Sequence, residues 1–119
     1  MKAEVLVEPL FLNTNEPIKW RFKATQFTPS TEEYVNFITG MPNARMELYV
    51  NGNTFSSEDG YIAFKDGGFV TIDLSNTTKL YANQEYNVRL KVFDDDHPKG
   101  RYLVHEDKEM SCAVFKVSK

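Results

Sequence analysis

The chain has 119 residues, of which 41% are hydrophobic, 13% aromatic and 26% charged, and its formal net charge at pH 7 is −3. This length favours a single domain over residues 1–119, whose core needs no metal or disulfide to hold it. The average composition argues against extended disorder, and no run approaches the roughly 18 apolar residues of a membrane-spanning helix. Because 14 basic residues face 17 acidic ones without a Lys/Arg cluster, we expect neither nucleic acid nor a membrane as partner.

The start of the chain and its cysteine content bear on where the protein is made. Glu4 and Glu8 interrupt the apolar stretch that a secretory signal peptide requires. Cys112 is the single cysteine, and its apolar flanks predict a buried structural thiol. We therefore expect synthesis in a reducing cytoplasm.

Alternation of apolar and polar residues runs through most of the chain and predicts β-strands. In the second strand Ile18, Trp20 and Phe22 alternate with cationic residues, which indicates an apolar inner face and a charged outer face. Strands are expected near residues 5–12, 17–25, 45–50, 61–64, 69–74, 85–93, 101–106 and 110–117. Turn chemistry separates them at Asn51-Gly52, Asp59-Gly60, Asp66-Gly67-Gly68 and His97-Pro98-Lys99-Gly100.

One segment departs from this alternation. Ser30-Thr31-Glu32-Glu33 matches a capping box, in which a hydroxyl and a later Glu satisfy the first amides of a helix. Tyr34 and Phe37 follow at helical spacing, and Gly40 provides a stop. We expect a short helix near residues 31–39 that covers one end of the sheets.

The stretch from Leu80 to Leu90 (LYANQEYNVRL) resembles the corner between the E and F strands of fibronectin type III and related immunoglobulin-like domains. There a Leu lies six residues before a Tyr whose ring packs in the core and whose hydroxyl bonds back to the corner backbone. Ala82 and Asn83 depart from the usual Pro and Gly. The resemblance implies an all-β, immunoglobulin-like antiparallel β-sandwich of about seven to eight strands. Its expected core includes Trp20, Phe22, Leu80, Tyr86, Val88 and Leu90.

Residues 92–100 (VFDDDHPKG) are similar to a strand and acidic turn found in small structural proteins of tailed bacteriophages and prophages. Many such proteins are single immunoglobulin-like sandwiches made in the host cytoplasm. The likeness implies a non-enzymatic virion component of the head, tail or connector. It would contact other virion proteins or copies of itself, through edge strands and the hairpins of residues 51–68.

Few residues in the sequence have metal-binding or catalytic potential. Asp94, Asp95 and Asp96 form the densest acidic cluster, but they lack the spacing of a calcium loop, and a solvated turn is the favoured interpretation. His97 and His105 with a lone cysteine do not make a zinc ligand set. No nucleophile or phosphate-binding motif is present, so we expect neither enzymatic activity nor a cofactor.

Cationic and aromatic residues define the expected surfaces. Lys19, Arg21 and Lys23 form one outward row, and Arg89 and Lys91 form another. If adjacent, the two rows could contact phosphate or an acidic protein surface, but solubility of an outward sheet face is the favoured interpretation. The aromatic residues of the middle hairpins either complete the core or form contacts between subunits; they are Phe55, Tyr61, Phe64 and Phe69. The alternative function is a stand-alone module that binds carbohydrate or calcium through loops 52–60 and 94–100.

Overall fold

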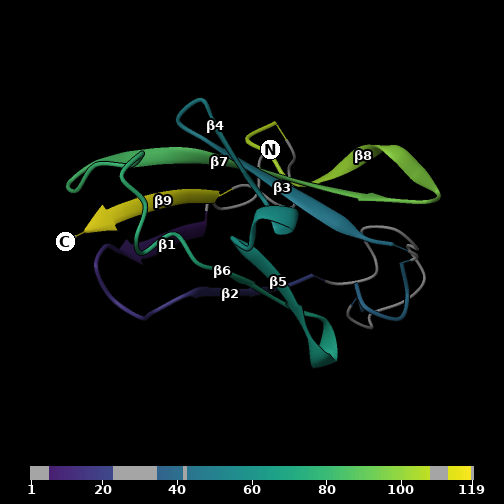
Figure 1. Ribbon diagram of the computed structural model, residues 1–119. Helices are drawn as coiled ribbons and strands as arrows, with labels where there is room; N and C mark the ends of the chain where they lie inside the picture. Colours follow the sequence, from purple (N-terminus) through teal and green to yellow (C-terminus); the bar gives the residue numbers. More distant parts are fainter. Residues whose placement is uncertain (1–5, 23–34, 42, 108–112, 119) are drawn as a thin grey trace.

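The computed structural model describes residues 6–22, 35–41, 43–107 and 113–118, and strands dominate it (Figure 1). Two 3₁₀ turns, at Ser57–Asp59 and Asp66–Gly68, are the helical segments within these ranges. The strands are β1 (Leu6–Phe11), β2 (Ile18–Arg21), β3 (Arg45–Val50), β4 (Asn53–Ser56), β5 (Ile62–Lys65), β6 (Phe69–Ile72), β7 (Glu85–Asp94), β8 (His97–Val104) and β9 (Ala113–Ser118). The fold is therefore all-β.

The strands form two sheets that face each other as the layers of a sandwich (Figure 1). Among the described residues, the larger sheet has six strands, five of them in the order β1-β9-β7-β3-β4 and the sixth, β8, paired with β7 beside this path. The smaller sheet has three strands in the order β2-β6-β5. In the larger sheet β9 and β8 share one edge of β7, since β9 pairs with residues 85–88 and β8 with residues 90–94. All pairs are antiparallel except that of β1 with β9, which is parallel and departs from the expected antiparallel pattern.

The core lies between the sheets and is built by alternate residues of each strand. The inward positions of β3 and β6, and those of β7 from Val88 onward, are almost completely shielded from solvent, because a side chain on one face of a strand recurs every second residue. Five of the six expected core side chains are at most 7% exposed, namely Trp20, Phe22, Leu80, Val88 and Leu90. The sixth, Tyr86, is half-buried and packs against the same cluster.

The corner that precedes β7 has the hydrogen bond expected from its sequence. The hydroxyl of Tyr86 accepts the backbone N–H of Tyr81 at 3.1 Å, while Leu80 is buried below it. Asn83 has a positive φ of 65°, a conformation that Gly adopts most easily and that Asn tolerates. Asn83 therefore fills the place of the expected Gly without breaking the corner.

Two sequence predictions about the strands are wrong, and a third, the strand at residues 17–25, is tested only as far as Phe22. Residues 53–56 form a separate strand, β4, because the Asn51-Gly52 turn reverses the chain tightly enough for both arms to pair. The run from His97 to Gly100 belongs to β8, and the reversal lies at residues 95–96. Pro98 is tolerated there because, among the described strands, β8 pairs with β7 alone, and its other edge has no ladder with any of them to break. Finally, β2 ends at Arg21, and residues 23–25 lie outside the described chain.

The helix expected near residues 31–39 is not formed at residues 35–39, and residues 31–34 lie outside the described chain. Val35 donates its N–H to the carbonyl of Phe22, which ties it to the end of β2. Asn36 then caps a single turn, since its side-chain oxygen accepts two backbone N–H groups and Gly40 donates to its carbonyl. Because Asn36 caps the backbone inside the expected helix and Val35 is hydrogen-bonded to Phe22, the described part of this segment forms a single turn.

Candidate functional site

The four aromatic residues expected at an interface lie in different environments. Phe55 is completely buried at an inward position of β4, so of the two alternatives for this residue the structure supports the core and contradicts the interface. Tyr61 is half-buried and stands edge-on to Phe55, with ring centroids 5.0 Å apart. Phe64 is half-buried and stacks on Phe37 at 5.7 Å. Phe69 alone points outward from a sheet, so the four do not form one surface.

The acidic turn does not gather its three carboxylates. Asp94 has a side chain only 3% exposed, and its Oδ1 lies 2.8 Å from Nδ1 of His97. Asp95 accepts a hydrogen bond from Nδ2 of Asn43 at 2.8 Å, and Asp96 is exposed. Asp94 is buried because β7 continues through it, which places it on the same inward face as Val92. The expectation of a wholly solvated turn is therefore wrong for Asp94.

No set of metal ligands emerges elsewhere in the described residues, among which no three His, Cys, Asp or Glu side chains come close enough to hold an ion. His105 packs edge-on against Tyr102 at 4.7 Å, and its Nδ1 accepts the backbone N–H of Asp107. Cys112, which the sequence predicts to be a buried structural thiol, lies outside the described chain.

The two cationic rows lie on different sheets and point away from each other. Lys19 and Arg21 lie on the outer face of β2, and Lys23 falls outside the described residues. On β7, Nε of Arg89 lies 3.0 Å from both carboxylate oxygens of Glu106. This guanidinium lowers the pKa of Glu106 to about 2, chiefly through its hydrogen bonds. Lys91 lies near the rings of two neighbouring aromatic residues. The rows therefore cannot act as one surface.

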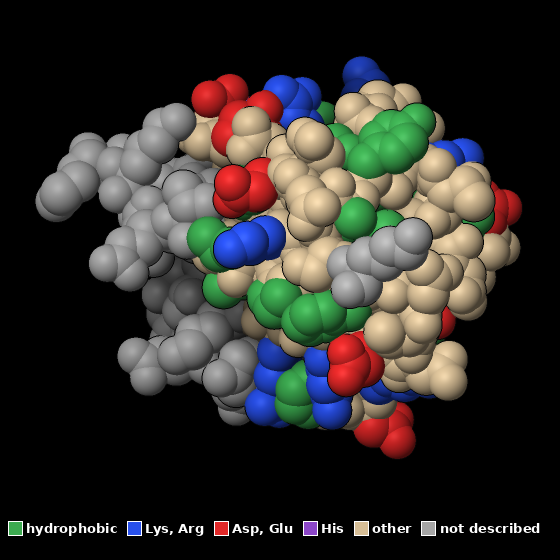
Figure 2. All heavy atoms as spheres, turned by 90° about the vertical axis from the view of Figure 1, so that its left-hand side faces the viewer, with side chains coloured by type: hydrophobic (Ala, Val, Ile, Leu, Met, Phe, Trp, Pro, Cys, Tyr) green, Lys and Arg blue, Asp and Glu red, His purple; other side chains and the backbone are tan. Residues whose placement is uncertain are grey.

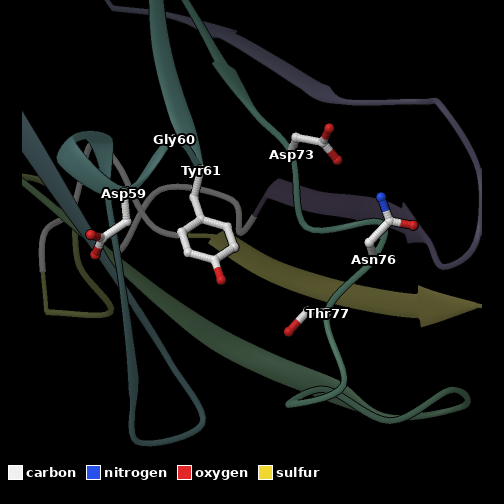
Figure 3. Close-up of a pocket in the computed structure, with 6 residues that line it drawn as sticks. All are labelled: Asp59, Gly60, Tyr61, Asp73, Asn76 and Thr77. Carbon is white, nitrogen blue, oxygen red and sulfur yellow. The ribbon is translucent and has the colours of Figure 1, made fainter.

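A shallow hollow of about 320 Å³ opens between the turn after β4 and the loop after β6 (Figure 3). The Tyr61 ring stands in its centre, with Asp59 on one side and Asn76 and Thr77 on the other (Figure 3). Asp73 joins the two segments, because its backbone N–H donates to the carbonyl of Tyr61 at 2.9 Å. The hollow thus combines carboxylate, amide and hydroxyl groups around an aromatic ring, which suits hydrogen bonding to a small polyhydroxylated ligand.

The Oδ1 atom of Asp73 already accepts two hydrogen bonds, from the backbone N–H and the hydroxyl of Ser75. Asp73 is therefore fixed in place before any ligand arrives. The turn at Asp59-Gly60 is visible in the sequence, but its approach to residues 73–77 is not, because the two segments meet only through the pairing of β5 with β6.

Three of the five large apolar side chains that are exposed among the described residues lie on strand β1. Leu6, Val7 and Phe11 are 50%, 52% and 40% exposed. Val7 and Phe11 share the outer face with Pro9, and Val7 is in register with Val114 of β9. We call these four residues, Val7, Pro9, Phe11 and Val114, the β1–β9 patch. The sequence predicts contacts at edge strands, but it does not indicate these particular residues, because β1 lacks clear alternation.

The open edge of β1 offers few backbone donors. Leu12 donates its N–H to the carbonyl of Ser118, so the backbone groups of even-numbered residues face β9 and those of odd-numbered residues face away. Pro9 falls on the outward set and has no N–H, and the carbonyl of Phe11 is bonded by the hydroxyl of Thr14. Any partner of this edge is therefore held mainly by the side chains of the β1–β9 patch.

No helix within the described residues has the length and apolar character needed to cross a membrane. Comparison of the chain with protein-family models, with curated proteins and with solved structures gave no match.

Proposed function

We propose that the protein is a non-enzymatic structural component of a bacteriophage or prophage particle that acts through protein–protein contacts. It is made in the host cytoplasm and assembled into the virion, where it contacts other virion proteins or copies of itself. The observation that carries the proposal is the β1–β9 patch, in which two large apolar side chains are about half exposed at the edge of the larger sheet. Such exposure is typical of a surface that a partner covers.

The same proposal includes an immunoglobulin-like form of the sandwich. If β2, β3, β5, β6, β7 and β9 correspond to strands B to G, then B, E and D share one sheet and C, F and G the other. This distribution is typical of immunoglobulin-like domains. The hydrogen bond from the Tyr81 amide to the Tyr86 hydroxyl, at the corner between E and F, supports the same assignment.

The energetic case for a contact at the β1–β9 patch rests on side chains. Burial of apolar surface contributes about 25 cal/mol per Å², so covering residues such as Val7 and Phe11 stabilises an assembly without polar chemistry. Pro9 disfavours strand-to-strand pairing at the same edge, and this limits uncontrolled aggregation through the backbone. The patch therefore suits a defined docking contact better than open-ended sheet extension.

Mass spectrometry of purified particles tests this proposal directly. We expect the wild-type chain in particles of the parent phage, and we expect the double variant Val7→Glu, Phe11→Glu to be missing from them although it folds. The matched control is the double variant Ile38→Glu, Tyr81→Glu, which adds the same two negative charges at side chains that are 52% and 64% exposed and belong to neither β1 nor β9, and it should still be incorporated. Absence of the wild-type chain from every particle type would refute the proposal.

A second candidate function is the binding of a carbohydrate, and the hollow around Tyr61 favours it. Asp59, Asn76 and Thr77 can bond neighbouring sugar hydroxyls while a sugar ring packs on the aromatic side chain. The loop at residues 94–100, expected as part of this site, is not among the lining residues. Isothermal titration with a glycan panel and with calcium chloride tests it. Heat that disappears in Asp59→Asn but persists in the exposed control Asp66→Asn would support a sugar site, and no heat from any glycan would refute it.

A further inference from the structure

The outer face of the smaller sheet carries cations around one aromatic ring. In the strand register Arg21 of β2 and Lys65 of β5 both lie opposite Phe69 of β6, and Lys19 lies in the next row. We call Lys19, Arg21, Lys65 and Phe69 the cationic face. Figure 2 shows Lys and Arg side chains with hydrophobic ones between them along the lower side of the molecule, where the smaller sheet lies, and acidic side chains border them.

The Phe69 ring holds two of these cations in place. The Lys19 ammonium lies 4.4 Å and the Arg21 guanidinium 4.5 Å from the ring centroid. Nε of Arg21 also donates a hydrogen bond of 2.8 Å to the carbonyl of Gly67. Charges that are already positioned lose less conformational entropy when a ligand binds than charges on freely rotating side chains.

The local charge of the cationic face is positive, although the net charge of the whole chain is negative. The protein has a net charge of −3, yet the outward residues of β2, β5 and β6 include three cations and no carboxylate. Lys19 and Lys65 are exposed, and neither forms an ion pair with another described residue. Because salt screens charges beyond about 8–10 Å, a ligand at this face responds to the local cations more than to the net charge.

We propose that the cationic face binds an extended acidic segment of a partner protein. Lys19 and Arg21 are two residues apart on a strand, so their Cα atoms are separated by about 7 Å, and carboxylates at alternate positions of an extended segment repeat that spacing. Nucleic acid fits less well, because the half-buried Phe69 ring is already occupied by two cations and is not open for base stacking. The face lies on the opposite sheet from the β1–β9 patch, so this proposal stands whether or not the protein is a virion component.

Fluorescence anisotropy with a labelled synthetic peptide that has glutamate at every second position tests the proposal at an ionic strength of about 0.1 M, where the screening length is about 10 Å. The triple variant Lys19→Gln, Arg21→Gln, Lys65→Gln removes the cations of the face. The matched control Lys79→Gln, Lys99→Gln, Lys116→Gln removes three exposed cations elsewhere. Both remove three positive charges, so the net charge goes from −3 to −6 in each. Circular dichroism establishes that both variants fold.

We expect the face variant to bind the peptide about tenfold more weakly than the wild type, and the control to lose less than about twofold. Phe69→Leu keeps every charge but removes the ring, and we expect an intermediate loss because Lys19 and Arg21 are no longer held. Equal losses in the two triple variants would show that net charge alone governs binding and would overturn the proposal. Tighter binding of an oligothymidylate of equal charge, or no binding of the peptide by the wild type, would also overturn it.

Discussion

Trp20 joins the two sheets, and its replacement is the most informative perturbation of the fold. Its side chain is 7% exposed, and its ring centroid lies 5.7 Å from that of Phe115 in the larger sheet. Its indole N–H donates a hydrogen bond of 2.6 Å to Oε1 of Glu8 on β1. Trp20→Ala removes both the packing and this hydrogen bond, whereas Trp20→Phe removes mainly the hydrogen bond.

The size of the effect follows from burial. A large aromatic side chain buries about 150–250 Å², and truncation of buried Trp or Phe to Ala costs roughly 3–5 kcal/mol. We expect Trp20→Ala to lower the free energy of unfolding by about 4 kcal/mol, because almost all of the ring is shielded. For Trp20→Phe we expect a loss of about 1–2 kcal/mol, since the half-buried Glu8 can regain water.

Urea unfolding followed by far-UV circular dichroism measures these losses. Tryptophan fluorescence cannot be the probe, because Trp20 is the only tryptophan in the chain. A double-mutant cycle of Trp20→Phe with Glu8→Ala isolates the hydrogen bond, and we expect a coupling energy of about 1 kcal/mol. A loss below about 1 kcal/mol for Trp20→Ala would refute the central position of the ring, and zero coupling would refute the bond between β1 and β2.

Three further predictions concern single side chains, each measured by urea unfolding. Tyr86→Phe should cost about 1 kcal/mol, since the corner loses one hydrogen bond, and an unchanged midpoint would contradict that role. Gly100→Ala should cost about 2–3 kcal/mol, against about 1 for Gly52→Ala. Both glycines have a positive φ, but of the two only Gly100 would place a new Cβ within 2.9 Å of neighbouring side chains. Equal losses of unfolding free energy in the two variants would contradict the steric explanation. Glu106→Gln should cost under about 1 kcal/mol at neutral pH. Because the pKa of Glu106 falls from 4.5 to about 2 beside Arg89, this loss should disappear as the pH drops through that range, and a loss independent of pH would rule the pairing out.

The sequence was sufficient where a pattern is local. Alternation located β3 at residues 45–50 to the residue, and Asn51-Gly52 located the turn that follows it. The resemblance of residues 80–90 to a fibronectin type III corner implied a hydrogen bond between the Tyr86 hydroxyl and the corner backbone, and the N–H of Tyr81 donates it. Each of these features depends on residues within a few positions of one another, so it can be predicted without knowledge of the rest of the fold.

Contacts between distant segments were decided only by the tertiary structure. Alternation predicts which residues share a face, but it does not predict where a strand ends. In the structure β7 extends to Asp94 and places this side chain in the interior. It also does not say which strands become neighbours, and so the exposed β1–β9 patch and the hollow beside Tyr61 were not foreseen. The sequence predicts that the cations of β2 form an outward row. Their position around the Phe69 ring depends on the pairing of β2 with β6, which the sequence does not show. The sequence by itself determined an all-β chain with this core, and pairing over long separations decided which surfaces remain available to partners, because register between strands is set by the whole core.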